Sequence, residues 1–257
     1  MYSGIIPPLI TPIDKNGEVC EQSVKNLIDL VKPHSTALMP TLSSGEGWAL
    51  NDKQWRDMVR FTLRHSSGLP VLAGAEYKTT QEVLDKAKIA KRMGVDAVVA
   101  TTPFRKDISQ DEIYKHFEQL KEAKIPVFIY NEKAISGNSI EYDTILRICK
   151  LGNIVGIKEA SGSPEFTRKL IDSKLGIPIF QGWEHLCSQS EGVEGYILPL
   201  ANLEPRLCLD MLNNPTARKQ SKIDSLCNRY NLTGNDWYAF LKKELHQRGT
   251  ISSRRVI

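Results

Sequence analysis

The sequence has little cysteine and lacks both a metal-binding motif and a long apolar run. Its five cysteines are odd in number and widely separated, with no Cys-x-x-Cys pair. This pattern favours free thiols in a reducing compartment over a disulfide framework. No stretch approaches the roughly 18 apolar residues of a membrane span, and residues 1–17 lack the basic start and apolar core of a signal peptide. We therefore expect a cytoplasmic protein with no metal ion and no membrane partner.

The chain also lacks a predominant sign of charge. The net charge of +4 is spread along 257 residues, and basic and acidic residues alternate in stretches such as "DEIYKHFEQLKEAK" at 111–124. Such mixing is typical of solvated helix faces, whereas a nucleic-acid-binding domain gathers basic residues on one surface. We expect no nucleic-acid partner.

Short β-rich apolar runs alternate with amphipathic, helix-like stretches over the first 203 residues. The predicted strands are 4–11, 36–40, 70–74, 96–103, 126–131, 153–160, 177–182 and 194–200. Helix-like stretches between them include 23–32, 80–94, 110–123 and 141–149, while 184–191 is a weak helix candidate. About eight strand–helix units in a chain of this length indicate an α/β fold, a (β/α)8 TIM barrel.

Two features qualify this fold prediction. A doubly wound open sheet is the alternative, but no Gly-x-Gly-x-x-Gly follows the first strand, which disfavours its dinucleotide-binding form. From residue 204 onward only helical patterns remain. We therefore divide the chain into a barrel at 1–203 and a C-terminal helical extension at 204–257 within the same structural unit.

Polar and charged side chains gather where the predicted strands end. In a barrel these carboxyl ends form the active-site face. The residues that follow the strands are Ser43, Ser44, Gly45, Glu46, Glu76, Thr101, Thr102, Arg105, Tyr130, Asn131, Lys158, Glu159, Gly182, Trp183 and Glu184. If the barrel prediction holds, these groups converge on one mouth.

Lys158 is the most informative of these residues. If Ile157 faces the helices, strand alternation points Lys158 into the barrel, where loss of solvation lowers the pKa of its ammonium group. A neutral amine can attack a ketone and form a Schiff base. The alternative is a structural lysine paired with Glu159 or Glu184. The residues alone leave both interpretations open.

Two neighbouring motifs are compatible with the same chemistry. The phenol of Tyr130 could shuttle a proton, or it could simply donate to a backbone carbonyl in the barrel wall. The "SSGE" turn at 43–46 offers hydroxyl and N–H groups suited to a carboxylate. It could equally be an ordinary serine turn before a helix with Asn51 as its N-cap.

Together these motifs resemble the family of dihydrodipicolinate synthase and N-acetylneuraminate lyase. The similarity lies in "GIIPPLITPIDKNGEV", "LSSGEGWALN" and "TTPF", and most specifically in "IYN", "GIKEASGS" and "FLKKELHQRGTISS". The resemblance implies a (β/α)8 barrel with a helical tail, assembled as a homo-oligomer, a tetramer or a dimer. It also implies a carbon–carbon lyase that needs no metal or organic cofactor.

The resemblance implies roles for individual residues. Lys158 would form the imine with pyruvate or a related 2-oxo acid, and Tyr130 would shuttle protons. Ser44 would belong to the proton relay, and Ser43 and Ser44 would bind the substrate carboxylate. The full set of expected substrate-binding residues is Ser43, Ser44, Gly45, Glu76, Arg105, Ile135, Gly182 and Ile197.

Several positions depart from the family pattern. Leu42 replaces the first glycine of the serine turn, and Glu76 stands where the family has a small residue. Ile135 occupies the position of an arginine that binds a dicarboxylate in the synthase branch, and Ile135 cannot make that contact. Arg105 stands where a neighbouring subunit's relay tyrosine is expected, and a guanidinium cannot relay protons near neutral pH. The helical tail is also shorter than usual.

Three hypotheses follow. The first is a Schiff-base lyase or aldolase that acts on a 2-oxo acid and an aldehyde other than aspartate semialdehyde, with Trp48 and Trp183 narrowing the mouth. The second is a 4-hydroxy-tetrahydrodipicolinate synthase whose carboxylate-binding residue has moved to Lys133 or Arg105. The third is a barrel that has lost catalysis and binds a 2-oxo acid or serves as a scaffold.

Overall fold

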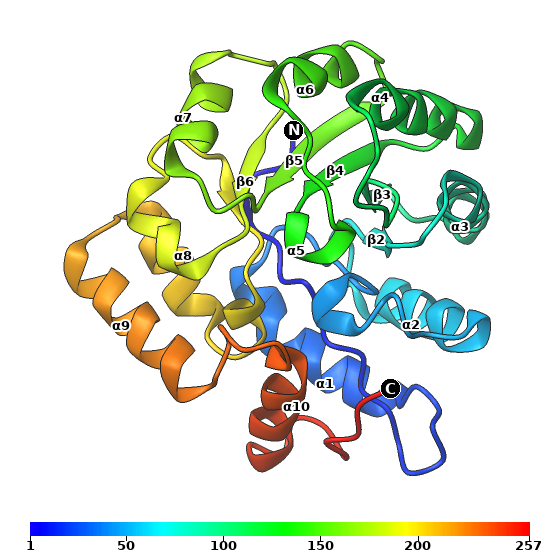
Figure 1. Cartoon of the computed structure of the whole chain (residues 1–257). Coiled ribbons are helices and arrows are strands. Elements are labelled where there is room, and N and C mark those ends of the chain that lie inside the picture. The colour runs from blue at the N-terminus through cyan, green and yellow to red at the C-terminus, as the bar shows by residue number, and fades with distance from the viewer.

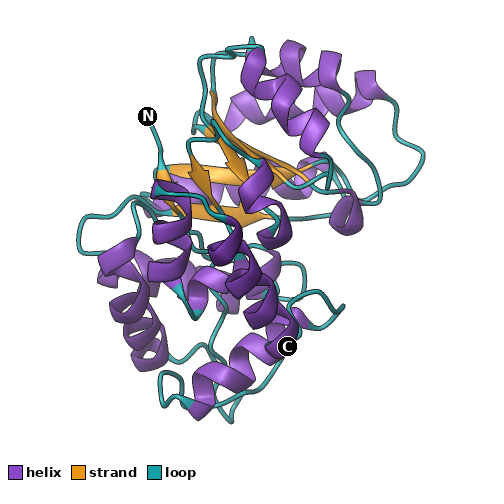
Figure 2. Cartoon of the chain, turned by 90° about the vertical axis from the view of Figure 1, so that its left-hand side faces the viewer, coloured by secondary structure: helices purple, strands orange, loops and turns teal.

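The computed structural model describes all 257 residues and consists of one curled parallel sheet surrounded by helices (Figure 1). The seven strands pair in the order β1-β7-β6-β5-β4-β3-β2, and every pairing is parallel. In Figure 2 the strands lie between two groups of helices. The strands are β1 Gly4–Ile5, β2 Leu72–Ala75, β3 Ala97–Thr101, β4 Val127–Asn131, β5 Ile154–Glu159, β6 Ile179–Gln181 and β7 Gly195–Tyr196.

The predicted strand at 36–40 is present only as two isolated parallel bridges between the two edges of the sheet. Leu38 pairs with Val71 on one side, and Met39 pairs with Pro8 on the other. Prolines at positions 7, 8, 40 and 70 explain the short ladder, because a proline has no N–H to donate. The segment thus connects the neighbourhoods of β1 and β2 without forming a regular strand.

Side chains alternate between the two faces of the sheet as the sequence predicts. Ile157 and Ile129 belong to the apolar cluster between the strands and the helices. Phe128 and Tyr130 belong to a separate cluster enclosed by the strands. Lys158 follows Ile157 and is paired with Tyr130, so it shares the enclosed face. Ile197 also lies in the enclosed cluster and is fully buried.

Ten helices cover the sheet and extend beyond it (Figure 1). Their bounds are α1 Glu21–Val31, α2 Asp52–His65, α3 Thr80–Met93, α4 Gln110–Gln119, α5 Lys133–Ser136, α6 Tyr142–Cys149, α7 Pro164–Asp172, α8 Pro205–Asn213, α9 Ala217–Arg229 and α10 Trp237–Gln247. The stretch predicted at 110–123 continues past α4 as a tighter 3-10 turn, Leu120–Ala123. The weak candidate at 184–191 is a 3-10 helix, Glu184–Gln189.

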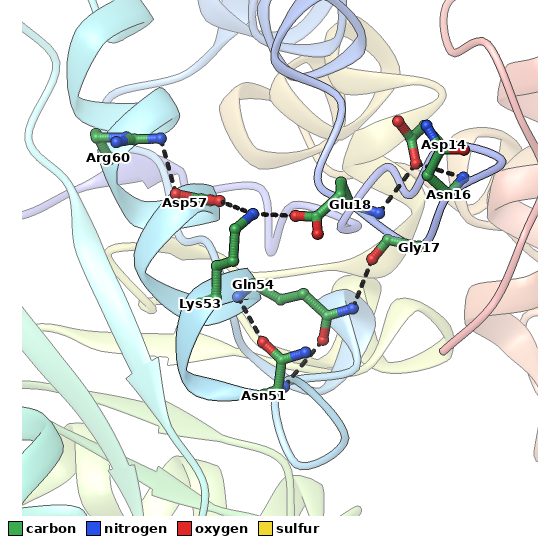
Figure 3. Close-up of polar contacts among 9 residues, drawn as sticks. All are labelled: Asp14, Asn16, Gly17, Glu18, Asn51, Lys53, Gln54, Asp57 and Arg60. Carbon is green, nitrogen blue, oxygen red and sulfur yellow. Dashed lines mark hydrogen bonds and ion pairs between the residues drawn. The ribbon is translucent and has the colours of Figure 1, made fainter.

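Local capping sets the start of α2, as predicted for Asn51. Asn51 accepts a hydrogen bond from the Gln54 backbone N–H at 2.9 Å, and the Gln54 side chain accepts one from the Asn51 N–H at 2.9 Å. Gln54 also donates to the carbonyl of Gly17 at 2.8 Å (Figure 3). This reciprocal cap ties the helix start to the 14–18 loop, where Asp14 accepts from the N–H of Glu18.

The C-terminal helices pack onto the sheet and onto the turns that follow its strands. Helix α8 contacts β1 and β7, and α9 contacts the 3-10 helix Glu184–Gln189. Helix α10 contacts the Ser43–Gly45 turn, where Lys242 forms a fully buried ion pair with Glu46. The N–H of Ile257 donates to the other oxygen of Glu46 at 2.7 Å. Glu46 therefore joins the serine turn to the end of the chain.

Candidate active site

A cavity of about 470 Å³ opens at the carboxyl ends of β4, β5 and β6. This volume is within the usual range for a small-molecule site, about 300–1,000 Å³. The cavity is lined by Ser43, Trp48, Phe104, Tyr130, Glu132, Ala134, Ile135, Lys158, Gly182, Trp183, Glu184, Pro199, Leu232, Thr233, Gly234, Asn235, Trp237 and Tyr238. The predicted residues Ser43, Tyr130, Ile135, Lys158 and Gly182 thus share one cavity.

Lys158 reaches the cavity without an ion-pair partner. It is 2% exposed, yet no carboxylate oxygen lies within 4.0 Å of its Nζ. The two acids proposed as structural partners are bonded elsewhere. Glu159 accepts from the Asn131 amide at 2.9 Å, and Glu184 accepts from the N–H of Leu200 at 2.9 Å. The paired-lysine interpretation therefore has no support in the geometry.

The space around Lys158 depends on Gly182, which directly follows β6. A Cβ at Gly182 would lie 3.1 Å from Cε of Lys158 and 2.8 Å from Cβ of Ala160. Any side chain at position 182 would therefore push the lysine or crowd its neighbour. Gly182 keeps one side of the lysine open to the cavity.

Burial sets the charge state of Lys158. Loss of solvation lowers the pKa of Lys158 from 10.5 to about 8, opposed by the carboxylates of Glu76, Glu132 and Glu184. Burial also raises the pKa of Glu76 to about 8 and that of Glu132 to about 7. A measurable share of Lys158 is thus a neutral amine near neutral pH, as a nucleophile requires.

Tyr130 lies against Lys158 and connects it to the serine turn. Nζ of Lys158 is 3.9 Å from the centroid of the Tyr130 ring. The Tyr130 hydroxyl is 3.4 Å from Oγ of Ser43, and no backbone carbonyl accepts from this phenol. Burial raises the pKa of Tyr130, so the group remains a phenol near neutral pH. A phenol and a hydroxyl in this arrangement can pass a proton.

The other residues of the serine turn lie behind the cavity wall. Ser44 is 1% exposed and accepts a hydrogen bond from the indole N–H of Trp237 at 3.4 Å. Gly45 packs against the chain at Leu9, where a Cβ would come within 2.7 Å of the carbonyl oxygen. The Gly45 carbonyl accepts from the Thr11 hydroxyl at 2.7 Å. Of the predicted turn residues, Ser43 alone lines the cavity.

Three further predicted residues lie outside the cavity lining. Glu76 is 1% exposed at the end of β2, and neither of its carboxyl oxygens has a hydrogen-bond partner. Arg105 points to solvent and pairs with Glu112. Ile197 is buried in the enclosed core. The binding roles predicted for these residues, and for Ser44 and Gly45, stay predictions.

Two parts of the cavity were absent from the sequence-based prediction. Glu132 follows directly after β4, and its position next to the "YN" motif was a signal that could have identified it. The segment Leu232–Tyr238 covers one side of the mouth although it lies more than 70 residues from Lys158 in the chain. No sequence pattern marks this segment, because only the packing of α9 and α10 brings it to the cavity.

No cluster of three or more His, Cys, Asp or Glu side chains is arranged to hold a metal ion. None of the helices combines the length and hydropathy that crossing a membrane requires.

The fold and the cavity together define a class of enzyme. A buried lysine that lacks a counter-ion, has a lowered pKa and lies against a phenol is suited to imine formation with a carbonyl substrate. It lies at the carboxyl end of a parallel strand, where α/β enzymes place their reacting groups. This arrangement is that of a class I aldolase-type carbon–carbon lyase.

The chain belongs to the Dihydrodipicolinate synthetase family, whose sequence profile matches residues 1–255. A 4-hydroxy-tetrahydrodipicolinate synthase of Neisseria meningitidis serogroup B is 31% identical over 221 residues, which are 82% of this chain and 75% of the relative. The predicted family and enzyme class are thereby confirmed.

Solved structures of relatives share the fold over nearly the full chain. A dihydrodipicolinate synthase from Bacillus anthracis has a TM-score of 0.92 and 24% identity, covering 100% of this chain and 92% of its own. A chloride-inhibited dihydrodipicolinate synthase from Acinetobacter baumannii, solved in complex with pyruvate, has a TM-score of 0.89 and 25% identity. That match covers 100% of this chain and 92% of the relative.

Proposed function

We propose that the protein forms an imine between Lys158 and pyruvate or a related 2-oxo acid and uses it to make or break a carbon–carbon bond. The observation that carries this proposal is the buried Lys158 without an ion-pair partner, 3.9 Å from the Tyr130 ring. Family membership supports the same reaction type. The imine needs no other cofactor, since the protonated C=N bond itself withdraws electrons.

In the proposed reaction the neutral amine of Lys158 attacks the ketone carbon of the 2-oxo acid. The carbinolamine then loses water to give the imine, and Tyr130 supplies and removes the protons through Ser43. The Ser43 hydroxyl and the N–H groups that begin the Ser43–Gly45 turn suit the substrate carboxylate. Loss of a methyl proton then gives an enamine, which adds to the carbonyl carbon of an aldehyde.

A second candidate is 4-hydroxy-tetrahydrodipicolinate synthase, the enzyme that the relatives from Archaeoglobus fulgidus and Neisseria meningitidis are named for. This candidate requires a cation for the carboxylate of its second substrate. Ile135 lines the cavity, whereas Arg105 is paired with Glu112 at the surface. We therefore favour a lyase or aldolase with another second substrate. Absence of pyruvate-dependent condensation with aspartate semialdehyde in a coupled reductase assay would exclude the synthase.

The proposal is tested by incubating the protein with pyruvate, reducing with borohydride and mapping the adduct by peptide mass spectrometry. We expect a reduced pyruvyl adduct on Lys158 and none in Lys158→Ala. Lys133→Ala is the matched control, because Lys133 is an exposed lysine next to the cavity that does not line it. An adduct on another lysine, or none with any 2-oxo acid, contradicts the proposal.

The same proposal includes the closure of the barrel, the role of the C-terminal residues, the cellular compartment and the oligomeric state. We propose that the segment 36–40 completes a (β/α)8 barrel at 1–203, because it bridges both edges of the sheet. Residues 204–257 then form a helical extension of the same unit. We further propose that the protein is cytoplasmic and forms a homo-oligomer, a dimer or a tetramer. The solution mass of the purified protein tests the oligomeric state.

A further inference from the structure

The part of the cavity between Lys158 and the mouth has no cationic side chain in its lining. Lys158 is the only basic residue among those that line the cavity, and the lining includes the acidic side chains of Glu132 and Glu184. Two cationic side chains considered for this role lie outside the lining, since Lys133 is exposed on α5 and Arg105 pairs with Glu112. An anionic group beyond the imine would therefore be desolvated next to two acidic side chains with no cation to pair with, which is unfavourable.

The same outer region has an aromatic wall built from two distant parts of the chain. Trp48 follows the serine turn, while Trp237 and Tyr238 begin α10. The Trp48 ring lies 6.4 Å from the Trp237 ring and 5.8 Å from the Tyr238 ring, between centroids. Trp237 and Tyr238 are 5.4 Å apart. These tilted and edge-on contacts hold the three rings together as one aromatic surface.

The remaining wall is also apolar or neutral. Phe104, Ile135 and Leu232 line it together with Trp183, whose indole N–H donates to the carbonyl of Ala160 at 2.8 Å. Because this bond satisfies the polar edge of Trp183, what the indole adds to the cavity is mainly ring surface. Thr233 and Asn235 offer uncharged hydrogen-bonding groups at the mouth.

We infer that the second substrate is an uncharged aldehyde with an apolar, ring-sized substituent that packs against Trp48, Trp237 and Tyr238. This inference rests on the proposed function, because the aldehyde reacts with the enamine on Lys158. The enamine carbon forms a bond to the aldehyde carbon, and the aldehyde oxygen takes a proton to become a hydroxyl. Water then releases Lys158 and a 4-hydroxy-2-oxo acid, with no oxidation or reduction.

The test compares two aromatic aldehydes, one neutral and one that carries a carboxylate on the ring carbon opposite the aldehyde. The purified protein is given pyruvate with either benzaldehyde or 4-carboxybenzaldehyde, and pyruvate consumption and the 4-hydroxy-2-oxo acid product are measured. We expect kcat/KM for benzaldehyde to exceed that for 4-carboxybenzaldehyde by about tenfold or more, because the pocket leaves the extra carboxylate unpaired.

Two variants make the comparison specific to the pocket. Ile135→Arg places a cation in the outer lining and is expected to reverse the preference toward 4-carboxybenzaldehyde. Tyr238→Leu removes one ring of the wall and is expected to raise KM for benzaldehyde about tenfold. Tyr114→Leu is the matched control, because Tyr114 is a tyrosine on α4 that contacts Arg147 and lies outside the cavity.

Borohydride trapping of pyruvate on the same samples distinguishes failure of imine formation from failure of the inferred aldehyde preference. Trapping on Lys158 together with a preference for benzaldehyde supports the inference. Trapping together with a preference for 4-carboxybenzaldehyde, or with no reaction of either aldehyde, overturns the inference and leaves the imine chemistry intact. No trapping at all overturns the proposed function instead.

Discussion

Lys158 lies over the ring of Tyr130, with 3.9 Å between Nζ and the ring centroid. The two residues are register partners on the parallel strands β5 and β4, so backbone pairing holds both side chains on the enclosed face of the sheet. The amine and the phenol are thus positioned by the ladder itself and not by a flexible loop. Imine formation requires the neutral amine of Lys158, and proton transfer requires the protonated phenol of Tyr130.

Removing the Tyr130 hydroxyl should affect catalysis much more than stability. Tyr130→Phe keeps the ring beside Lys158 and removes a phenol whose one hydrogen-bond partner is Ser43, at 3.4 Å. We expect the rate of imine trapping with pyruvate to fall about 10²–10⁴-fold, which is the usual contribution of a positioned proton-transfer group to the rate. The free energy of unfolding should change little in urea denaturation.

Tyr196→Phe is the control for this change. Tyr196 is a buried tyrosine whose hydroxyl donates to the carbonyl of Cys187 at 3.2 Å, away from the cavity. We expect it to trap pyruvate at the normal rate. Equal rates for Tyr130→Phe and the wild type would show that the phenol is not the proton shuttle.

The rate of imine trapping should depend on pH through Lys158. Burial lowers the pKa of Lys158 to about 8, and only the neutral amine attacks the ketone. The trapping rate is therefore expected to rise about tenfold per pH unit below pH 8 and to level off above it. Initial rates of adduct formation between pH 6 and 10 measure this profile. A midpoint near the ordinary lysine pKa of 10.5 would contradict it.

Neutralising Glu76 should move that profile toward lower pH. Burial holds the pKa of Glu76 at about 8, so Glu76 becomes ionised over the same pH range in which Lys158 loses its proton. Its negative charge then raises the pKa of Lys158, and Glu76→Gln removes that interaction. We expect the midpoint of the trapping profile to fall. Glu122→Gln, at an exposed position in the 3-10 turn after α4, is expected to leave the midpoint in place. An unchanged midpoint in Glu76→Gln would show that its charge does not act on Lys158.

The same substitution should flatten the dependence of stability on pH. Burial raises the pKa of Glu76 from 4.5 to about 8, so the native state holds a proton that the unfolded chain releases. The contribution of Glu76 to stability is present below pH 4.5 and is lost as the pH rises to 8. A difference of one between the folded and unfolded pKa is worth about 1.4 kcal/mol. In urea denaturation, the free energy of unfolding should decline less between pH 5 and pH 8 in Glu76→Gln than in the wild type.

Breaking the buried ion pair beneath the serine turn should destabilise the protein. Lys242 is fully buried, pairs with Glu46 and donates to the carbonyl of Arg255 at 3.0 Å. Lys242→Met leaves the carboxylate of Glu46 without its cation, which is expected to cost about 3–5 kcal/mol in urea unfolding. The double variant Glu46→Gln/Lys242→Met should recover part of this loss. Equal losses in the single and double variants would contradict this account.

Much of the site follows from local sequence alone. The alternation through "GIKEA" assigns Lys158 to the face opposite Ile157, and the structure places the two on those faces. The cap at Asn51 and the helix end at Gly94 also follow from their own few residues, since Gly94 adopts the left-handed conformation that ends α3. Strand and helix patterns predicted the parallel sheet, although the prolines around 36–40 reduced one predicted strand to two bridges.

The sequence by itself determined the parallel α/β architecture and the face of the sheet on which Lys158 and Tyr130 lie, because periodicity and strand ends are properties of short stretches. Only the tertiary structure decided which charges surround Lys158 and what covers the mouth. Glu184 could pair with the lysine as far as the sequence shows, but its oxygen accepts from Leu200. Trp237 and Tyr238 reach the cavity through the packing of α10 against the serine turn. Burial and long-range packing set both the pKa of the lysine and the shape of the pocket, and no local pattern encodes them.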